Sequence, residues 1–167
     1  MSLDNIQLPA IVIYDLFKNS LVDLNRTPTV STSAPAKSFS FLGNNEKNIA
    51  IVVKDEEAIY LEETALNFLM GILAACKLTM ADIALVNLIQ HPYINYTNFA
   101  DKINAEKILI FGHGPQDLEL PLQFPDYQVQ KYNDQVYLTA PHLKIIAADK
   151  TEKTKLWNSL KQLFSLA

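Results

Sequence analysis

Residues 48–88 read NIAIVVKDEEAIYLEETALNFLMGILAACKLTMADIALVNL, and this stretch decides the fold. Two short apolar runs, 49–53 and 83–88, flank a segment from Tyr60 to Cys76 whose apolar residues recur at helical spacing. A strand that is buried on both faces needs a continuous apolar run, and a parallel neighbour needs a helical crossover. The stretch therefore predicts a strand–helix–strand unit with two parallel strands.

Further strands are expected toward the carboxyl end. Residues 107–111 form a third continuous apolar run, which predicts a third buried strand. Residues 127–132 and 135–138 alternate between apolar and polar side chains around Asn133 and Asp134, which predicts an antiparallel ribbon or two half-exposed strands. Strands of this kind among helices predict an α/β fold.

The remaining helices carry recognisable start signals. A short helix is expected at 96–103, capped by Thr97 or Asn95. Pro141 opens another short helix, and Asp149 caps a last one. Each of these residues suits the first turn of a helix, where backbone N–H groups lack intrahelical partners.

Length and composition predict one domain. The chain has 167 residues, of which 49% are apolar, enough to bury a substantial core. Within this single domain (1–167), we expect an apolar amino-terminal segment at 1–25, a flexible loop at 26–37 and a core at 38–167. The loop is predicted because 26–37 holds two prolines and mostly small polar residues. A short strand at 20–24 is expected to pair with 39–42.

Charge and cysteine content bound the location and the partners. The net charge is −4, so a direct contact with nucleic acid, which needs a basic face, is not expected. No apolar stretch reaches the roughly 18 residues that a membrane span needs, and the amino terminus lacks a signal-peptide pattern. A single cysteine, Cys76, gives no support for export, and its helical spacing predicts a core residue. A cytoplasmic location is therefore expected.

The amino-terminal segment is unusually apolar between residues 6 and 17. Two interpretations remain open: a helix packed on the chain's own sheet, or a segment that a partner covers. In the second interpretation, the partner-binding residues are Ile6, Leu8, Ile11, Val12, Tyr14, Leu16 and Phe17.

No cofactor motif is found. Gly112 and Gly114 follow an apolar run, but the third glycine of a dinucleotide fingerprint would stand at position 117, which is Asp117. Pro115 also disturbs the helix start that should face a pyrophosphate. No cofactor and no metal are predicted.

Four polar residues are candidates for chemistry. Asp55, His91 and His113 each follow an expected parallel strand, and Asp117 comes shortly after His113. Because the carboxyl ends of parallel strands meet at one edge, these groups are candidates for acid–base work there. The alternative is ordinary loop polarity, because no metal-ligand spacing and no nucleophile elbow occur.

The last helices are rich in lysine. They carry five lysines against Asp149 and Glu152, and these lysines are Lys144, Lys150, Lys153, Lys155 and Lys161. A solvated face explains them, and a basic patch that touches an acidic partner is the alternative.

Taken in order, these elements resemble the psi subunit of the bacterial DNA polymerase III holoenzyme. The matching pieces are the turn LTMADI (78–83), the strand end IFG (110–112), the step LTAPHL (138–143) and KLWN (155–158) in the last helix. Asp149-Lys150 stands where that family has an asparagine-proline cap. The resemblance covers roughly residues 48–164.

The resemblance implies both a fold and a function. It implies a three-layer α/β/α sandwich with a mostly parallel central sheet, related in architecture to uracil-DNA glycosylases but without their catalysis. It also implies a non-catalytic adaptor of the clamp-loader complex. In that family the amino-terminal segment binds the clamp loader and the globular part binds the chi subunit, so residues 6–17 would be the clamp-loader contact.

The alternative function is a hydrolase of the same fold that acts on a base or nucleoside through Asp55, His91, His113 and Asp117. Active glycosylases resemble one another in a glycine-rich first loop and a late His-Pro-Ser motif. The first strand here ends in Lys54-Asp55-Glu56-Glu57 with no glycine, and His91-Pro92-Tyr93 comes too early. The two hypotheses differ in geometry: an enzyme needs these groups to converge on one pocket, and an adaptor needs an exposed apolar surface.

Overall fold

The computed structural model describes residues 39–121, 123 and 125–166, which lie in a compact unit that begins at residue 38. The predictions made for the segment 1–25, its partner-binding residues, the strand at 20–24 and the loop at 26–37 fall outside the described residues.

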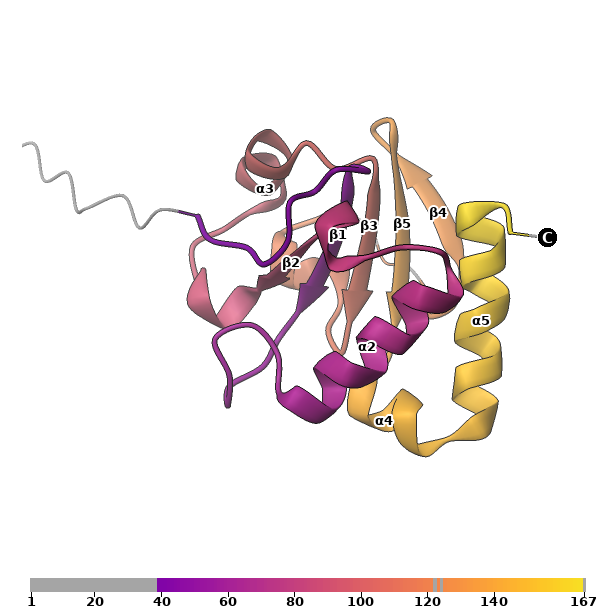
Figure 1. Cartoon of the computed structure of the whole chain (residues 1–167). Coiled ribbons are helices and arrows are strands. Elements are labelled where there is room, and N and C mark those ends of the chain that lie inside the picture. The colour runs from indigo at the N-terminus through magenta and orange to yellow at the C-terminus, as the bar shows by residue number, and fades with distance from the viewer. Residues whose placement is uncertain (1–38, 122, 124, 167) are drawn as a thin grey trace, which may run out of the picture. The chain divides into compact units, whose positions relative to one another are not determined.

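A five-stranded, mostly parallel sheet forms the centre of this unit (Figure 1). The spatial order is β2-β1-β3-β5-β4, and only β4 runs antiparallel to its neighbour. The strands are β1 (Ile49–Val53), β2 (Ile83–Asn87), β3 (Lys107–Phe111), β4 (Val129–Tyr132) and β5 (Gln135–Ala140).

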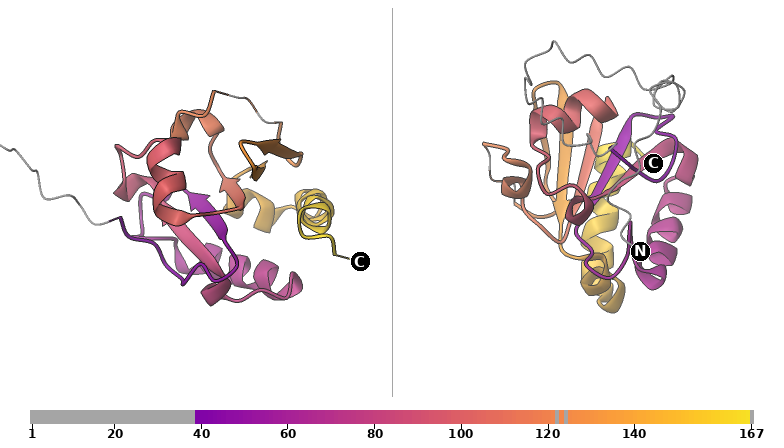
Figure 2. Two further views of the ribbon diagram at one scale, coloured as in Figure 1. Left: turned by 90° about the horizontal axis from the view of Figure 1, so that it is seen from above. Right: turned by 90° about the vertical axis from the view of Figure 1, so that its left-hand side faces the viewer.

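Helices cover both faces of the sheet and complete a three-layer α/β/α sandwich, as predicted (Figure 2). One face carries α2 (Glu63–Ala75), α4 (Leu143–Ala148) and α5 (Lys150–Phe164). The other face carries α3 (Tyr96–Ile103) and the segment around Leu118 and Leu120.

The continuous apolar runs form strands because both faces of the sheet are buried. Successive side chains of a strand point to opposite faces. In β1, Ile49, Ile51 and Val53 pack toward α2 and α5, whereas Ala50 and Val52 pack toward α3. All five residues of β1 and of β2 are buried, which alternating polarity would not allow.

Two predicted helix starts are confirmed. Asn95 caps α3 by accepting a hydrogen bond from the backbone N–H of Asn98 at 3.0 Å. Asp149 caps α5 by accepting from the N–H of Thr151 at 2.6 Å. A third start lies at the single turn Met80–Asp82, where Thr79 and Asp82 form a capping box.

Two predictions are corrected. The helix expected from Tyr60 begins only at Glu63, because the backbone before it is held in a loop by Asp55. Of the two alternatives for 127–138, the antiparallel ribbon is confirmed, because β4 pairs antiparallel with β5. Half-exposure is wrong for β5, which is buried from Tyr137 onward because it pairs with β3 and lies under α5. Residues 39–42 contribute one isolated antiparallel bridge, between Leu42 and Leu85 of β2.

Candidate functional site

The carboxyl edge of the sheet holds Asp55, but its carboxylate is occupied by the local backbone. Its two oxygens accept hydrogen bonds from the N–H of Glu57 at 2.9 Å and from the N–H of Glu62 at 2.8 Å. Burial opposes the charge of Asp55, but backbone hydrogen bonds from Glu62, Glu57 and Ala58, with the charge of Lys144, hold the pKa of Asp55 below its usual range. Asp55 therefore organises the loop between β1 and α2.

Asn87 completes this loop from the end of β2. Its amide nitrogen donates to the carbonyl oxygens of Asp55, Ala58 and Ile59 at 2.7, 3.0 and 3.2 Å. Its oxygen accepts from the N–H of Asp55 and of Ile89, both at 3.1 Å. Asn87 is not among the residues predicted to act at this edge, although a polar residue at the end of a buried apolar run is the signal that marks it.

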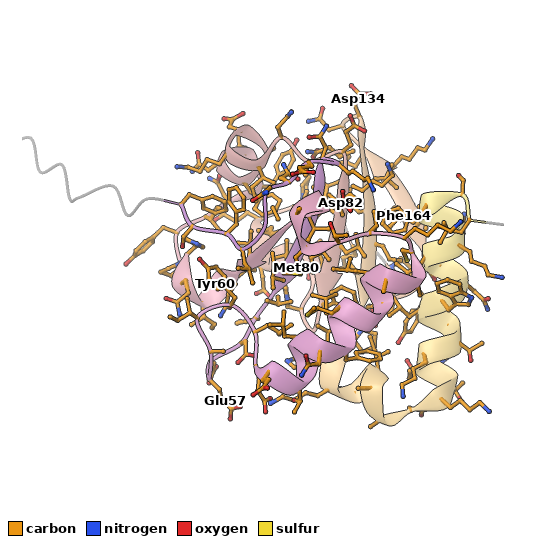
Figure 3. All side chains as sticks on the ribbon, viewed as in Figure 1. Glu57, Tyr60, Met80, Asp82, Asp134 and Phe164 are labelled. Carbon is orange, nitrogen blue, oxygen red and sulfur yellow. The ribbon has the colours of Figure 1, made fainter. Side chains whose placement is uncertain are left out.

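Lys144, in the first turn of α4, forms ion pairs with two residues of the same loop. Its ammonium group lies 2.5 Å from a carboxylate oxygen of Glu62 and 3.3 Å from one of Glu57. Hydrogen bonds to these two carboxylates raise the pKa of Lys144. Figure 3 shows Glu57 at the carboxyl edge of the sheet and Asp134 at the opposite end.

His113 is held with its ring turned into the protein. Its Nδ1 donates to the carbonyl oxygen of Phe111 at 2.8 Å, so the neutral ring carries its lone pair on Nε2. That Nε2 is buried, and among the described residues it has no hydrogen-bond partner. Burial lowers the pKa of His113, and the hydrogen bond to Phe111 and the charge of Asp117 oppose this only in part. The ring is therefore a neutral, half-buried group.

A small hollow of about 270 Å³ lies at the same edge. His91, Asp117 and Lys54 contribute its polar lining, and the rest is apolar. The ring of His91 stacks on Phe39 at 4.6 Å between centroids, and its Nε2 lies 2.9 Å from the carbonyl oxygen of Ser40. The structure thus brings His91 and Asp117 to one hollow, and the lining includes neither Asp55 nor His113.

A larger hollow lies between α2 and α5, on the opposite side of the sheet from α3. This groove has a volume of about 390 Å³, and its walls are almost entirely apolar. Phe68, Gly71 and Ala75 of α2 face Trp157 and Leu160 of α5 across it. The two helices lie on one face of the sheet and approach each other (Figure 1).

The outer surface of α2 is apolar beyond this groove. No charged residue occurs between Thr64 and Cys76. Met70 is 48% exposed and lines a second apolar hollow, of about 310 Å³, with Leu66 and Met80. Cys76 is buried in the core, as predicted. Beyond its first residue, Glu63, α2 has no charge on its exposed side, and this composition is typical of a helix that another surface covers.

Within the part of the chain that the structure describes, no group of three His, Cys, Asp or Glu side chains could hold a metal ion. None of the helices described there is long and apolar enough to cross a membrane. Comparison of the sequence with models of protein families and with curated proteins gave no match. The function proposed below therefore depends on the resemblance in the sequence and on the geometry of these two sites.

Proposed function

We propose that this chain is a non-catalytic protein–protein adaptor that resembles the psi subunit of the bacterial DNA polymerase III clamp-loader complex. Its partners are clamp-loader subunits and a chi-like subunit, and it makes no direct contact with nucleic acid. The observation that carries the proposal is the open apolar groove between α2 and α5, next to an uncharged outer face of α2.

The state of the carboxyl edge supports the same proposal. An enzyme would need Asp55 free to act on a substrate, but both of its oxygens accept backbone hydrogen bonds. Asp55 and His113 do not line the hollow that contains His91 and Asp117. Asp55 and His113 therefore do not form one catalytic pocket with His91 and Asp117. This supports a function that depends on the groove and not on the carboxyl edge.

The ordered resemblance supplies the assignment to replication. The turn at 78–83, with its capping box, and the step at 138–143, which leads from β5 into α4, lie where the resemblance requires an element boundary. In the psi family the amino-terminal segment binds the clamp loader. The proposal therefore assigns the clamp-loader contact to residues 6–17.

The experiment is an affinity capture from a lysate of the native organism, with captured proteins identified by mass spectrometry. The full chain is compared with a Leu8→Asp/Phe17→Asp variant and with a Gln7→Asp/Asn19→Asp control, which adds the same charges at polar positions. We expect clamp-loader subunits with the wild type and the control, and their loss with the Leu8→Asp/Phe17→Asp variant. Recovery of no replication subunit by any of the three would refute the assignment.

A hydrolase that acts on a base or nucleoside is the second candidate function, because His91 and Asp117 line one hollow with Lys54. A carboxylate beside an imidazole is a common acid–base pair. The test is release of free base from uracil-containing DNA and from nucleosides, followed by chromatography. The adaptor proposal expects no release above background, and release that Asp117→Asn abolishes would support the hydrolase instead.

A further inference from the structure

The geometry points to one occupant for the groove between α2 and α5: an amphipathic helix of a partner protein that carries acidic residues beside its large apolar side chains. This inference rests on the adaptor function and specifies the chemistry of a partner. Figure 3 shows the side chains of α2 and α5 in place.

The groove is open and deep enough to receive side chains. A Cβ atom added at Gly71 would meet nothing within 4 Å, so the surface of α2 there is bare backbone. Phe68 and Trp157 stand on either side of it as large apolar walls. A volume of about 390 Å³ leaves room for more than one large apolar side chain. Aromatic walls around a small floor are the usual form of an anchoring pocket at a protein interface.

The backbone N–H and C=O groups of the occupant must already be hydrogen-bonded within the occupant itself. The groove is formed by two helices, whose N–H and C=O groups bond within each helix and offer nothing to an added strand. An extended peptide would leave its own backbone groups unpaired against an apolar wall, which is unfavourable. A helix buries only side chains, and it can pack along the ridges of α2, which is about 20 Å long.

The charges around the groove require an acidic partner. Lys153 lines the groove, with its ammonium group 5.7 Å from the centroid of the Phe68 ring. Lys161 lies 5.9 Å from the centroid of the Trp157 ring. Among the described residues, neither lysine makes an ion pair, whereas Lys155 pairs with Glu152 at 2.7 Å. None of the described residues that line the groove carries a carboxylate.

A second copy of the chain fits this surface poorly. In a symmetric dimer through the groove, each copy would present Lys153 and Lys161 toward the same lysines of the other. Like charges that face each other across an interface are unfavourable. Acidic side chains on a partner helix would instead pair with these two lysines and leave the apolar contact between them intact.

The test uses the full chain and its single tryptophan, Trp157, as the reporter. The probe is a synthetic helical peptide of about 16 residues, with leucine on one face and glutamate on its flanks, and without aromatic residues. The control peptide has lysine in place of glutamate. We expect the acidic peptide to shift the Trp157 emission to shorter wavelength in a saturable way, and the basic peptide to leave it unchanged. The affinity should fall as salt rises from about 0.05 M to about 0.5 M.

Matched variants locate the binding. Ala75 lines the groove, and its neighbour Ala74 is also exposed but does not line it. Ala75→Glu should weaken binding by at least about tenfold, and Ala74→Glu by less than about twofold. Lys153→Glu should weaken it in the same way, and Lys150→Glu, which changes the net charge equally, should have little effect. Equal effects within either pair, or equal binding of the two peptides, would overturn the proposal.

Two further measurements distinguish a partner helix from the other possible occupants of the groove. The capture experiment distinguishes a failure of this inference from a failure of the proposed adaptor function. A dimer of the free chain that Ala75→Glu dissociates in sedimentation would assign the groove to a second copy. A Trp157 emission of the free chain that changes with Phe17→Asp would assign it to the chain's own segment. Either result would overturn the proposal. Capture of clamp-loader subunits without peptide binding would refute this inference alone. Peptide binding without such capture would refute the replication assignment alone.

Discussion

The side chain of Asn87, the last residue of β2, makes two hydrogen bonds to the backbone of Asp55, which follows the neighbouring strand β1. The Asn87 amide nitrogen lies 2.7 Å from the carbonyl oxygen of Asp55, and the Asn87 oxygen lies 3.1 Å from the Asp55 nitrogen. Because Asn87 is 1% exposed, this amide satisfies backbone groups that water cannot reach. The Asp55 carboxylate itself accepts hydrogen bonds from the backbone N–H groups of Glu57 and Glu62, so both the backbone and the side chain of this candidate catalytic residue are used in the loop.

Replacement of Asn87 by leucine should destabilise the protein. Leucine has a similar size but leaves the carbonyls of Asp55, Ala58 and Ile59 without their donor. We expect the free energy of unfolding to fall by about 3 kcal/mol, because unsatisfied buried polar groups are costly. Urea unfolding measures it. Asn98→Ala, at an exposed position of α3, should change stability by less than about 0.5 kcal/mol. Similar stabilities for the two variants would contradict this role of Asn87.

Asp55 should contribute to the acid sensitivity of the fold. Its pKa is lower in the folded protein than in the unfolded chain, so its stabilising contribution is present above about pH 4. The contribution is lost as pH falls through the folded pKa. Asp55→Asn should therefore be less stable than the wild type at neutral pH, and the difference should shrink as pH falls below about 4. Urea midpoints at several pH values test this. A constant difference would exclude the effect.

His113 should add a second pH dependence, at higher pH. Burial lowers its pKa below the ordinary value of about 6.5, so the unfolded chain takes up a proton before the folded protein does. Its contribution to stability is therefore present above about pH 6.5 and is lost as pH falls toward the folded pKa. His113→Asn keeps a donor for the carbonyl of Phe111 but does not titrate. The variant should lose less stability than the wild type below about pH 6.5, as thermal unfolding would report.

Two glycines should respond to alanine in opposite directions. Gly71 lies inside α2 with open space around it, so Gly71→Ala should raise the free energy of unfolding by about 1 kcal/mol. Gly43 has a φ of +108°, and an added Cβ would lie 2.1 Å from the carbonyl oxygen of Ile83. Gly43→Ala should therefore lower the free energy by at least about 2 kcal/mol. Chemical denaturation of both variants checks the prediction, and a change of the same sign in both would contradict it.

Alanine substitutions at two adjacent positions of α2, one in the core and one on the surface, should lower the free energy of unfolding by different amounts. Leu69 is fully buried, whereas Met70 is 48% exposed. Leu69→Ala should cost about 2 to 5 kcal/mol, because it leaves a cavity in the core. Met70→Ala should cost less than about 1 kcal/mol. Equal losses in urea unfolding would mean that the Met70 side is covered in the free protein.

The fold could be predicted from the sequence because its strands are buried on both faces. That environment demands uninterrupted apolar runs, and the runs at 49–53, 83–88 and 107–111 are short enough to be strands. The caps at Asn95 and Asp149 were equally readable, because capping is a local interaction. The start of α2 was predicted three residues too early, because the loop before it is held by Asp55, which follows β1, and by Asn87 at the end of β2.

The sites depended on contacts that no local pattern records. The four candidate groups lie in loops that follow strands, but the directions of their side chains depend on how the sheet brings these loops together. Asp55 turns to backbone N–H groups, while His91 and Asp117 reach a common hollow. The apolar groove was not predicted. The helical spacing of apolar residues in α2 does not determine which of its apolar sides α5 leaves exposed.

The sequence by itself determined that this chain folds as an α/β unit, because the length and continuity of apolar runs select buried parallel strands and their helical connections. Only the tertiary structure decided which surfaces remain available. The packing of α2 and α5 on one face of the sheet leaves an apolar groove beside Lys153 and Lys161, which make no ion pair among the described residues. Hydrogen bonds across 32 residues of sequence bind Asp55 to Asn87. The groove and the Asp55–Asn87 hydrogen bonds both depend on contacts between segments that are distant in the sequence. The residue pattern within one segment does not determine such contacts.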